Sequence, residues 1–561
     1  MAADRARVSS ADPYFDLGTF HRPVSTTCSH AQAWFDRGLV WTYAFNHEEA
    51  AKCFERAIAH DPDCAIAYWG LAYTRGPNYN KPWEAFDLDE RDEIATQTYR
   101  AVEQARENIH GASVVEQALV NALKHRYQES RLVDDLSVWN LDYAAAMAAV
   151  YASFPGDLDV AALYADALMN LTPWQLWDLE TGKPAQGART EEARQVLEPA
   201  LRLPGGSEHP GLLHLYIHLM EMSNTPEVAA PWADALRELV PDAGHLNHMP
   251  SHIDILCGNY EMAITANTKA TAADRKFVER EGSLNFYTLY RAHDYHFLIY
   301  AAMFAGQSKV ALQNVDLLEA AVPEQLIRVE SPPMADWLES FLSIRMHVLI
   351  RFGRWDDILA LQTPTDPDLY AVTTAMMWYA KGIAAAVTSR AAEAKLYREN
   401  FHEALKRVPD SRTLFNNKCS DILRVAEAML EGEYLFRQGN TDEAFIHLER
   451  AILLEGSLTY DEPWGWMQPA RHAYGALSLE SGATQRAMEV YAADLGYNTK
   501  LPRARTHPNN VWALHGYHEC LVRMKRFPEA QSIKRILDPL LTLADVPITS
   551  SCFCRRLQQN T

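Results

Sequence analysis

Hydrophobic positions in this chain do not alternate with polar ones at the two-residue period of a half-buried β-strand. Ala and Leu are abundant, glycine is sparse at 25 residues, and runs of Val, Ile and Thr with a period of two are missing. Because Ala and Leu favour helices, the pattern predicts an all-α protein. With 48% hydrophobic residues the chain can bury a large core.

Small and aromatic residues recur at fixed positions in the segment that begins at Ala31. Within one 34-residue unit they stand at Trp34, Gly38, Trp41, Ala50, Phe54, Ala57 and Pro62. This spacing resembles the tetratricopeptide repeat (TPR), in which two antiparallel helices touch through small residues and a proline follows the second helix. Every one of these positions matches the repeat.

The same register continues more loosely along the chain. Further units open at Pro210, Gly244 and Ala292, and small residues mark two more around Gly432 and Gly475. We expect a TPR-like right-handed superhelix (an α-solenoid) of roughly eight to ten helix pairs, each packed on its neighbours. The solenoid is expected over residues 31–540, with an N-terminal extension over 1–30 and a C-terminal tail over 541–561.

Histidine is concentrated in one part of this array. Eight of the 21 histidines lie between His209 and His296. In three consecutive units, side chains three or four residues apart share one helical face. In the TPR family the equivalent positions line the concave groove, so the resemblance implies a histidine-rich groove over residues 209–305. The side chains on this face are His214, His218, Glu221, His248, His252, His293 and His296.

Two imidazoles four residues apart can bind one metal ion from a single helical turn. His214 with His218 and His248 with His252 are HxxxH pairs of this kind. One such pair alone is ordinarily two partly exposed histidines, but two pairs and a neighbouring HxxH in one register favour a site. We therefore predict that the seven groove side chains bind a divalent transition metal. Imidazole suits Zn, Fe and Cu, and the residue types do not choose among them.

Two tyrosines near the last histidines are candidate catalytic groups. Tyr295 and Tyr300 stand close to them in the sequence and can supply a phenol as an acid or a base. A phosphate-binding glycine loop, a nucleophile elbow and a dinucleotide fingerprint are missing from the sequence, which leaves ATP-dependent, serine-hydrolase and NAD-dependent chemistry without support.

The net charge and the cysteine content indicate which partners and which cellular compartment to expect. The net charge of −21 repels phosphate backbones and anionic lipids, so we expect neither a nucleic acid nor a membrane partner. The eight cysteines are scattered, as in a reducing compartment, and we expect a cytoplasmic protein. Cys552 and Cys554 are expected to be two unpaired thiols in a polar tail.

Longer phrases resemble a narrower group of TPR proteins from bacteria and fungi. The phrases are HLYIHLME, HLNHMPSHI and HDYHFLIYAAMFAG, and the similarity extends over most of the chain from about residue 30 to about residue 535. Some fungal members are similar to proteins encoded beside natural-product genes. The resemblance thus implies a tailoring step in secondary-metabolite biosynthesis.

Three functions are compatible with these features. The first is a metal-dependent enzyme that acts on a small organic molecule in the groove. The alternative is a TPR scaffold that binds a peptide or a partner protein without catalysis. Grooves that clamp peptides commonly use Lys, Arg and Asn at the positions that carry histidine here, so we favour the enzyme. Metal storage or sensing is a third reading, which needs no substrate pocket.

Overall fold

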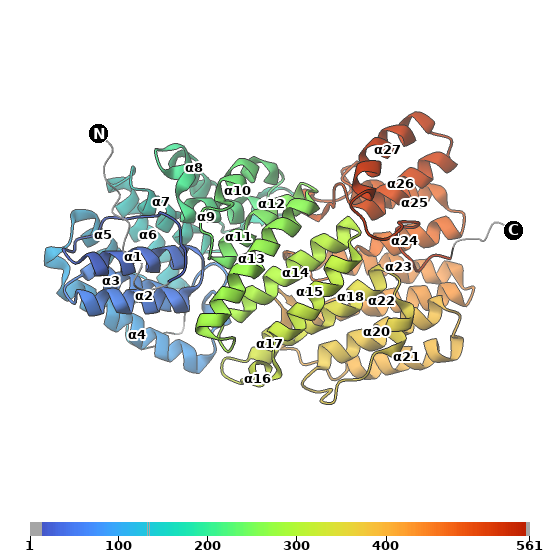
Figure 1. The fold of residues 1–561 in the computed structure, drawn as a ribbon, viewed down its shortest axis with the longest axis horizontal. Coiled ribbons are helices and arrows are strands. Elements are labelled where there is room, and N and C mark those ends of the chain that lie inside the picture. The colour runs from blue at the N-terminus through green and yellow to red at the C-terminus, as the bar shows by residue number, and fades with distance from the viewer. Residues whose placement is uncertain (1–13, 132, 134, 557–561) are drawn as a thin grey trace.

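The computed structural model describes residues 14–131, 133 and 135–556. Helices follow one another along an elongated molecule, from α1 in the N-terminal part to α27 in the C-terminal part (Figure 1). The first half of the chain contains α1 (Ser29–Tyr43), α2 (His47–His60), α3 (Ala65–Arg75), α4 (Leu88–Glu107), α5 (Val114–Leu123), α6 (Ser137–Ser153), α7 (Leu158–Met169), α8 (Thr190–Arg202), α9 (Pro210–Glu221), α10 (Ala230–Leu236), α11 (Gly244–His248), α12 (Pro250–Leu256) and α13 (Tyr260–Glu281).

The second half contains α14 (Thr288–Ala305), α15 (Ser308–Ala321), α16 (Glu324–Ile327), α17 (Met334–Leu338), α18 (Ile344–Arg351), α19 (Trp355–Ala360), α20 (Ala371–Val387), α21 (Ala391–Leu405), α22 (Cys419–Arg437), α23 (Thr441–Gly456), α24 (Ala470–Glu480), α25 (Thr484–Asp494), α26 (Val511–Arg523) and α27 (Phe527–Leu541). Two short antiparallel ribbons pair β1 (Trp177–Asp178) with β2 (Lys183–Pro184) and β3 (Thr413–Leu414) with β4 (Asn417–Lys418). In the part of the chain that the structure describes, no helix combines the length and the hydropathy needed to cross a membrane.

Helices that are neighbours in the sequence pack as hairpins. The closest pairs are α1 with α2, α20 with α21, and α22 with α23, and each hairpin also touches the next one along the chain. This is the arrangement of a helical solenoid. The fold class predicted from the sequence is therefore confirmed.

Glycines at the helix crossings explain why the repeat needs small residues. A Cβ atom on Gly38 would stand 2.8 Å from the ring of Phe54, which lies sixteen positions later. Gly475 repeats the arrangement with Tyr491, also sixteen positions later, where a Cβ would come within 2.4 Å of the ring. Two helices of one hairpin can approach this closely only where one contributes no side chain. The register that is clear in the first unit thus has the same packing near the C-terminus.

Two hydrophobic cores meet at the helices that carry the histidines. The first core runs from Leu17 to Tyr290 and the second begins at Ile255, so the boundary passes through α12 and α14. Tyr460 belongs to the first core although it follows α23, because the loop after that helix returns to the middle of the molecule. This return brings residues that are distant in the sequence to the histidine helices.

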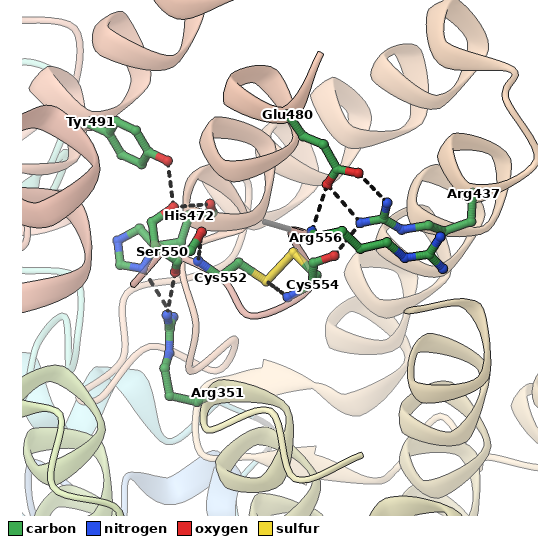
Figure 2. The surroundings of a disulfide bond; sticks show 10 residues. Arg351, Arg437, His472, Glu480, Tyr491, Ser550, Cys552, Cys554 and Arg556 are labelled. Carbon is green, nitrogen blue, oxygen red and sulfur yellow. Dashed lines mark hydrogen bonds and ion pairs between the residues drawn. A yellow bond between two sulfur atoms is a disulfide. The ribbon is translucent and has the colours of Figure 1, made fainter. Parts of the chain in front are cut away.

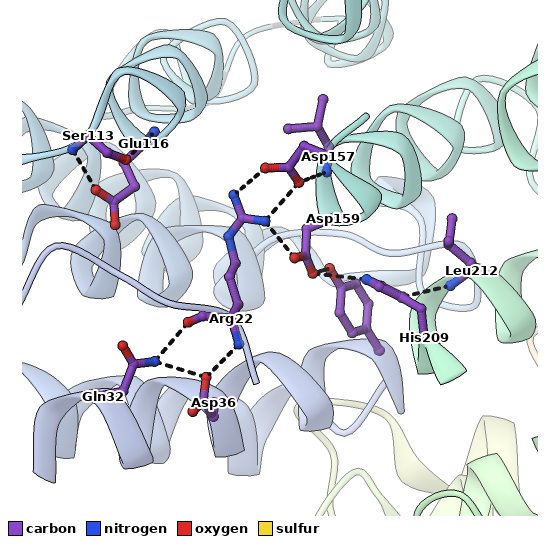
Figure 3. A network of polar contacts seen from close by, with 11 residues as sticks. Arg22, Gln32, Asp36, Ser113, Glu116, Asp157, Asp159, His209 and Leu212 are labelled. Atoms are coloured by element: carbon purple, nitrogen blue, oxygen red, sulfur yellow. Dashed lines mark hydrogen bonds and ion pairs between the residues drawn. The ribbon is translucent and has the colours of Figure 1, made fainter. Parts of the chain in front are cut away.

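The segment before α1 packs on the first hairpins. The Arg22 guanidinium donates to Asp157 at 2.8 Å and to Asp159 at 2.5 Å (Figure 3). Asp159 also accepts a hydrogen bond from the hydroxyl of Tyr43 at 2.5 Å and contacts His209 at 3.1 Å. The network ties the N-terminal segment to α1, α7 and the start of α9.

The segment after α27 corrects one expectation. Cys552 and Cys554 are buried and form a disulfide (Figure 2), so the prediction of unpaired thiols in a polar tail is wrong. The reason is that this segment turns back into the second core. The Ser551 hydroxyl donates to the carbonyl of His472 at 2.8 Å, and Arg351 donates to the Ser551 carbonyl at 2.9 Å.

Candidate metal centre

Four helices position the predicted ligands. His214 and His218 lie on α9, and His293 lies on α14. His248 ends α11 and His252 lies on α12, so the second HxxxH pair spans a helix break at Met249 and Pro250. A proline has no N–H to continue the hydrogen-bond ladder, which accounts for the break. The two imidazoles nevertheless remain close, because the backbone keeps helical dihedral angles at Met249.

The imidazoles form two groups of three. The first triad consists of His214, His218 and His245, and the second triad consists of His248, His252 and His293. Within each triad one nitrogen of every ring lies within 4.8 Å of the others. All six side chains are buried. The structure therefore brings together five of the predicted histidines and adds His245.

His245 was not predicted as a site residue because it opens its helix, where a role near the helix cap was the simpler interpretation. Its position in the repeat unit was the available signal, since it is equivalent to His293 in the next unit. Neither ring nitrogen of His245 has a hydrogen-bond partner among the described residues. A buried imidazole without any partner is costly unless something else meets its lone pair.

Outer contacts fix the orientation of His214 and His248. The Nδ1 atom of His214 donates to the carbonyl of Tyr43 at 2.6 Å. The Nδ1 atom of His248 donates to Oδ1 of Asn267 at 2.6 Å. Asn267 can accept here because its own amide donates to the carbonyl of Ala263 at 2.8 Å. In both histidines the proton is thus held on Nδ1, and Nε2 carries the lone pair.

Glu221 orients one histidine of each triad. Its Oε1 accepts from Nδ1 of His218 at 3.0 Å, and its Oε2 accepts from Nδ1 of His252 at 2.6 Å. Glu462, from the loop after α23, also contacts Nδ1 of His252. Burial, together with the neighbouring Glu462 carboxyl, raises the pKa of Glu221 to about 8. Glu221, predicted as a ligand, therefore stands behind the imidazoles and faces their Nδ1 atoms.

Lone pairs converge where the two imidazoles of the second triad meet. The Nε2 atoms of His248 and His252 are 2.7 Å apart. Since Nδ1 of each ring faces an acceptor, so short a contact requires either a proton on one Nε2 atom or a cation that meets both lone pairs. The Nε2 atoms of His214 and His218 likewise have no partner among the described residues. Burial and the neighbouring imidazoles hold the pKa of His248 well below its usual value.

His296 is separate from both triads. Its ring lies 5.6 Å from that of Phe341 and 6.4 Å from that of Phe415. It belongs to no metal-binding group among residues 14–131, 133 and 135–556. Burial, with His347 nearby, lowers its pKa to about 3. His296 thus occupies an apolar environment on the same helix as His293.

The two predicted catalytic tyrosines do not line the cavity that adjoins the triads. Tyr300 stacks on Phe304 at 4.4 Å and faces a separate small cavity beside His507. The hydroxyl of Tyr295 interacts with Arg275, while burial raises its pKa. Tyr290, five residues before Tyr295, does line the cavity beside the triads.

A cavity of about 580 Å³ opens on both triads. His218 and His245 of the first triad and His252 and His293 of the second line it. Its other walls include Trp174, Phe286, Tyr290, Trp337, Phe415, Asp461 and Glu462. Asp461 and Glu462 were missed as site residues. Both residues lie in the loop after α23, and nothing local in its sequence indicates which helices it contacts.

Comparisons with known proteins identify the repeat. A tetratricopeptide-repeat family model matches residues 31–64. No curated protein matches the sequence significantly. Among solved structures, the crystal structure of the APC/C hetero-tetramer Cut9–Hcn1 is similar at 15% identity and a TM-score of 0.31, over 84% of this chain and 74% of that chain. The structure of Naa15/Naa10 bound to HypK-THB is similar at 13% identity and a TM-score of 0.21, over 91% and 70%.

The resemblance to a narrower group with paired HxxxH helices stays a prediction, because the family model covers only the first unit. That unit is the one in which every characteristic position matches. The chain thus has an all-α solenoid fold whose first unit, residues 31–64, matches the tetratricopeptide repeat.

Proposed function

We propose that this protein is a metal-dependent enzyme that acts on a small organic molecule held beside the two triads. One observation carries the proposal. In four of the six histidines Nδ1 is held by an acceptor while Nε2 points toward other imidazoles. Metal-binding histidines typically have this arrangement, because the outer acceptor fixes the tautomer and the ring orientation. The four histidines are His214, His218, His248 and His252.

The donor set fits a divalent ion of the Zn, Fe or Cu type, since imidazole suits all three. Such an ion supplies Lewis-acid chemistry or lowers the pKa of bound water. The chain supplies the rest of the site. Trp174 and Phe415 provide apolar walls that exclude water, and the carboxyl of Glu462 lies at the cavity wall where it can hold or accept a proton.

The size of the cavity supports a small organic substrate. Ligand pockets for such molecules typically have volumes of about 300–1,000 Å³, with mostly apolar walls and a few convergent polar groups. The present cavity falls in this range at about 580 Å³. A tailoring step in secondary-metabolite biosynthesis is the substrate context that the sequence resemblance implies.

A second candidate is an interaction scaffold that binds a peptide or a partner protein. The TPR match over residues 31–64 favours it, because stacked helical repeats create extended concave binding surfaces. The buried histidines do not favour it. A peptide clamp needs accessible cationic or amide donors, whereas burial lowers the pKa of His218 and His245 well below the usual value and keeps both rings neutral.

Metal analysis of the purified protein, with and without the second triad, tests the proposal. We expect the wild type to retain a transition metal and a His248→Ala/His252→Ala variant to retain clearly less of it. Conversion of small molecules from a metabolite extract should then depend on the metal and stop after chelation. If both proteins contain equal and negligible amounts of transition metal, the proposed metal site is wrong. A metal-loaded protein that converts nothing favours the scaffold.

A further inference from the structure

We propose that the centre is dinuclear, with one ion in each triad and both ions open to the same cavity. The inference rests on the proposed function, which needs only one metal ion. It adds how many ions bind, which side chains bind each ion, and that both ions face the same cavity.

The number of donors argues for two ions. A tetrahedral site takes four ligands, and a catalytic site of this kind uses three protein ligands and leaves the fourth position open. The two triads together offer six buried imidazoles. A single tetrahedral ion can bind at most four of them, and any buried ring nitrogen that is left without a partner costs roughly 1–3 kcal/mol.

Each triad has the dimensions of one site. Ligand nitrogens about 2.0–2.1 Å from a tetrahedral ion stand roughly 3.4 Å apart. The nitrogens of each triad lie within 4.8 Å of one another, and the closest pair, in the second triad, is 2.7 Å apart. Shifts of about an ångström therefore close each triad around one ion. No imidazole has to serve both triads.

The two triads are adjacent and share one substrate space. The rings of His218 and His252 are 5.7 Å apart, and those of His245 and His248 are 5.6 Å apart. Members of both triads line the cavity of about 580 Å³. One small oxygen-bearing ligand in that cavity can therefore reach both ions, which is the arrangement that lets two metals activate a shared group.

Glu221 is the structural link between the triads. One carboxylate oxygen accepts from His218 of the first triad and the other from His252 of the second. Groups that mix a carboxylate with histidines of both triads, such as His218, Glu221 and His252, also have close donor atoms. We favour the all-imidazole sets because both oxygens of Glu221 already accept N–H groups. Imidazole-only sets suit Zn²⁺ and Cu²⁺.

Zn²⁺ titration of the metal-free full-length protein tests the inference, with bound metal counted by elemental analysis. We expect two ions per wild-type chain. We expect one ion in a His214→Asn/His218→Asn variant and one in a His248→Asn/His293→Asn variant. His296→Asn is the matched control, because this buried histidine lies on the same helix as His293 but outside both triads, and it should keep two ions.

One ion in the wild type and none in either triad variant indicates a single shared site, which overturns the dinuclear centre and leaves the proposed function standing. No ion in the wild type overturns both. Circular dichroism of each variant shows whether it folds. A second measurement needs no variant: in Cu²⁺-loaded wild type, two close ions couple and weaken the electron paramagnetic resonance signal. A full-intensity signal from two isolated Cu²⁺ ions contradicts the inference.

Discussion

At the scale of single residues, Glu221 has the most informative environment. It is fully buried on α9 and accepts from one histidine of each triad. The sequence predicted that Glu221 belongs to the site, because it follows His218 by three residues on one helical face. Its predicted role as a ligand stays a prediction, since His218, Glu221 and His252 also form a group that could hold a metal ion.

Replacing Glu221 with Gln should weaken metal binding by about 10–100-fold, the usual effect of removing an outer acceptor. An amide has one acceptor oxygen, so His218 and His252 cannot both keep their contacts. Competition against a chromophoric chelator measures the affinity. Glu339→Gln is the control, because Glu339 is also fully buried but accepts from Thr373 and belongs to none of the described groups that could hold a metal ion. Equal affinities of the two variants contradict this role of Glu221.

At the scale of elements, the local periodicity of the sequence predicted the helices. The contacts between distant segments depend on long-range packing, which a local pattern does not show. His214 with His218 and His248 with His252 were predicted as ligands because helical spacing alone places them on one face. Asn267 and Glu462 could not be found in this way. Asn267 reaches His248 from α13, and Glu462 reaches His252 from a loop more than two hundred residues later. No local pattern encodes either contact.

The glycines at the helix crossings give a prediction about stability. Gly475→Ala should lower the free energy of unfolding by about 1–3 kcal/mol, because the new Cβ overlaps the ring of Tyr491. Gly111→Ala is the control, since a Cβ there meets nothing within 4 Å. Chemical denaturation compares the two. If both variants match the wild type, the close crossing of α24 and α25 does not limit the packing of this unit.

At the scale of the whole molecule, two hydrophobic cores meet around a group of buried histidines. The sequence indicated the solenoid and the segment of chain that holds the histidines. It did not indicate that the loop after α23 and the segment after α27 return to the interior, because those contacts depend on how the whole array closes.

Buried neutral histidines should make the metal-free protein sensitive to acid. Burial, with Arg351 nearby, lowers the pKa of His347 to about 3. Below pH 6.5 the unfolded chain takes up a proton that the folded chain excludes, so stability falls as the pH drops from about 6.5 toward 3, by up to about 1.4 kcal/mol per pH unit for each such histidine. His347→Phe should make this decline shallower in denaturation experiments between pH 7 and pH 4. If the free energy of unfolding of the variant falls with pH as steeply as that of the wild type, His347 does not contribute to the acid sensitivity.

The most direct test of the central claim is anomalous X-ray diffraction from crystals of the purified protein, recorded at the absorption edges of Zn, Fe and Cu. We predict two anomalous peaks beside the cavity, one about 2 Å from nitrogens of His214, His218 and His245 and the other about 2 Å from nitrogens of His248, His252 and His293. One peak shared by both triads would contradict the dinuclear centre. A map without any peak near these histidines, from metal-supplemented protein, would contradict the metal site itself.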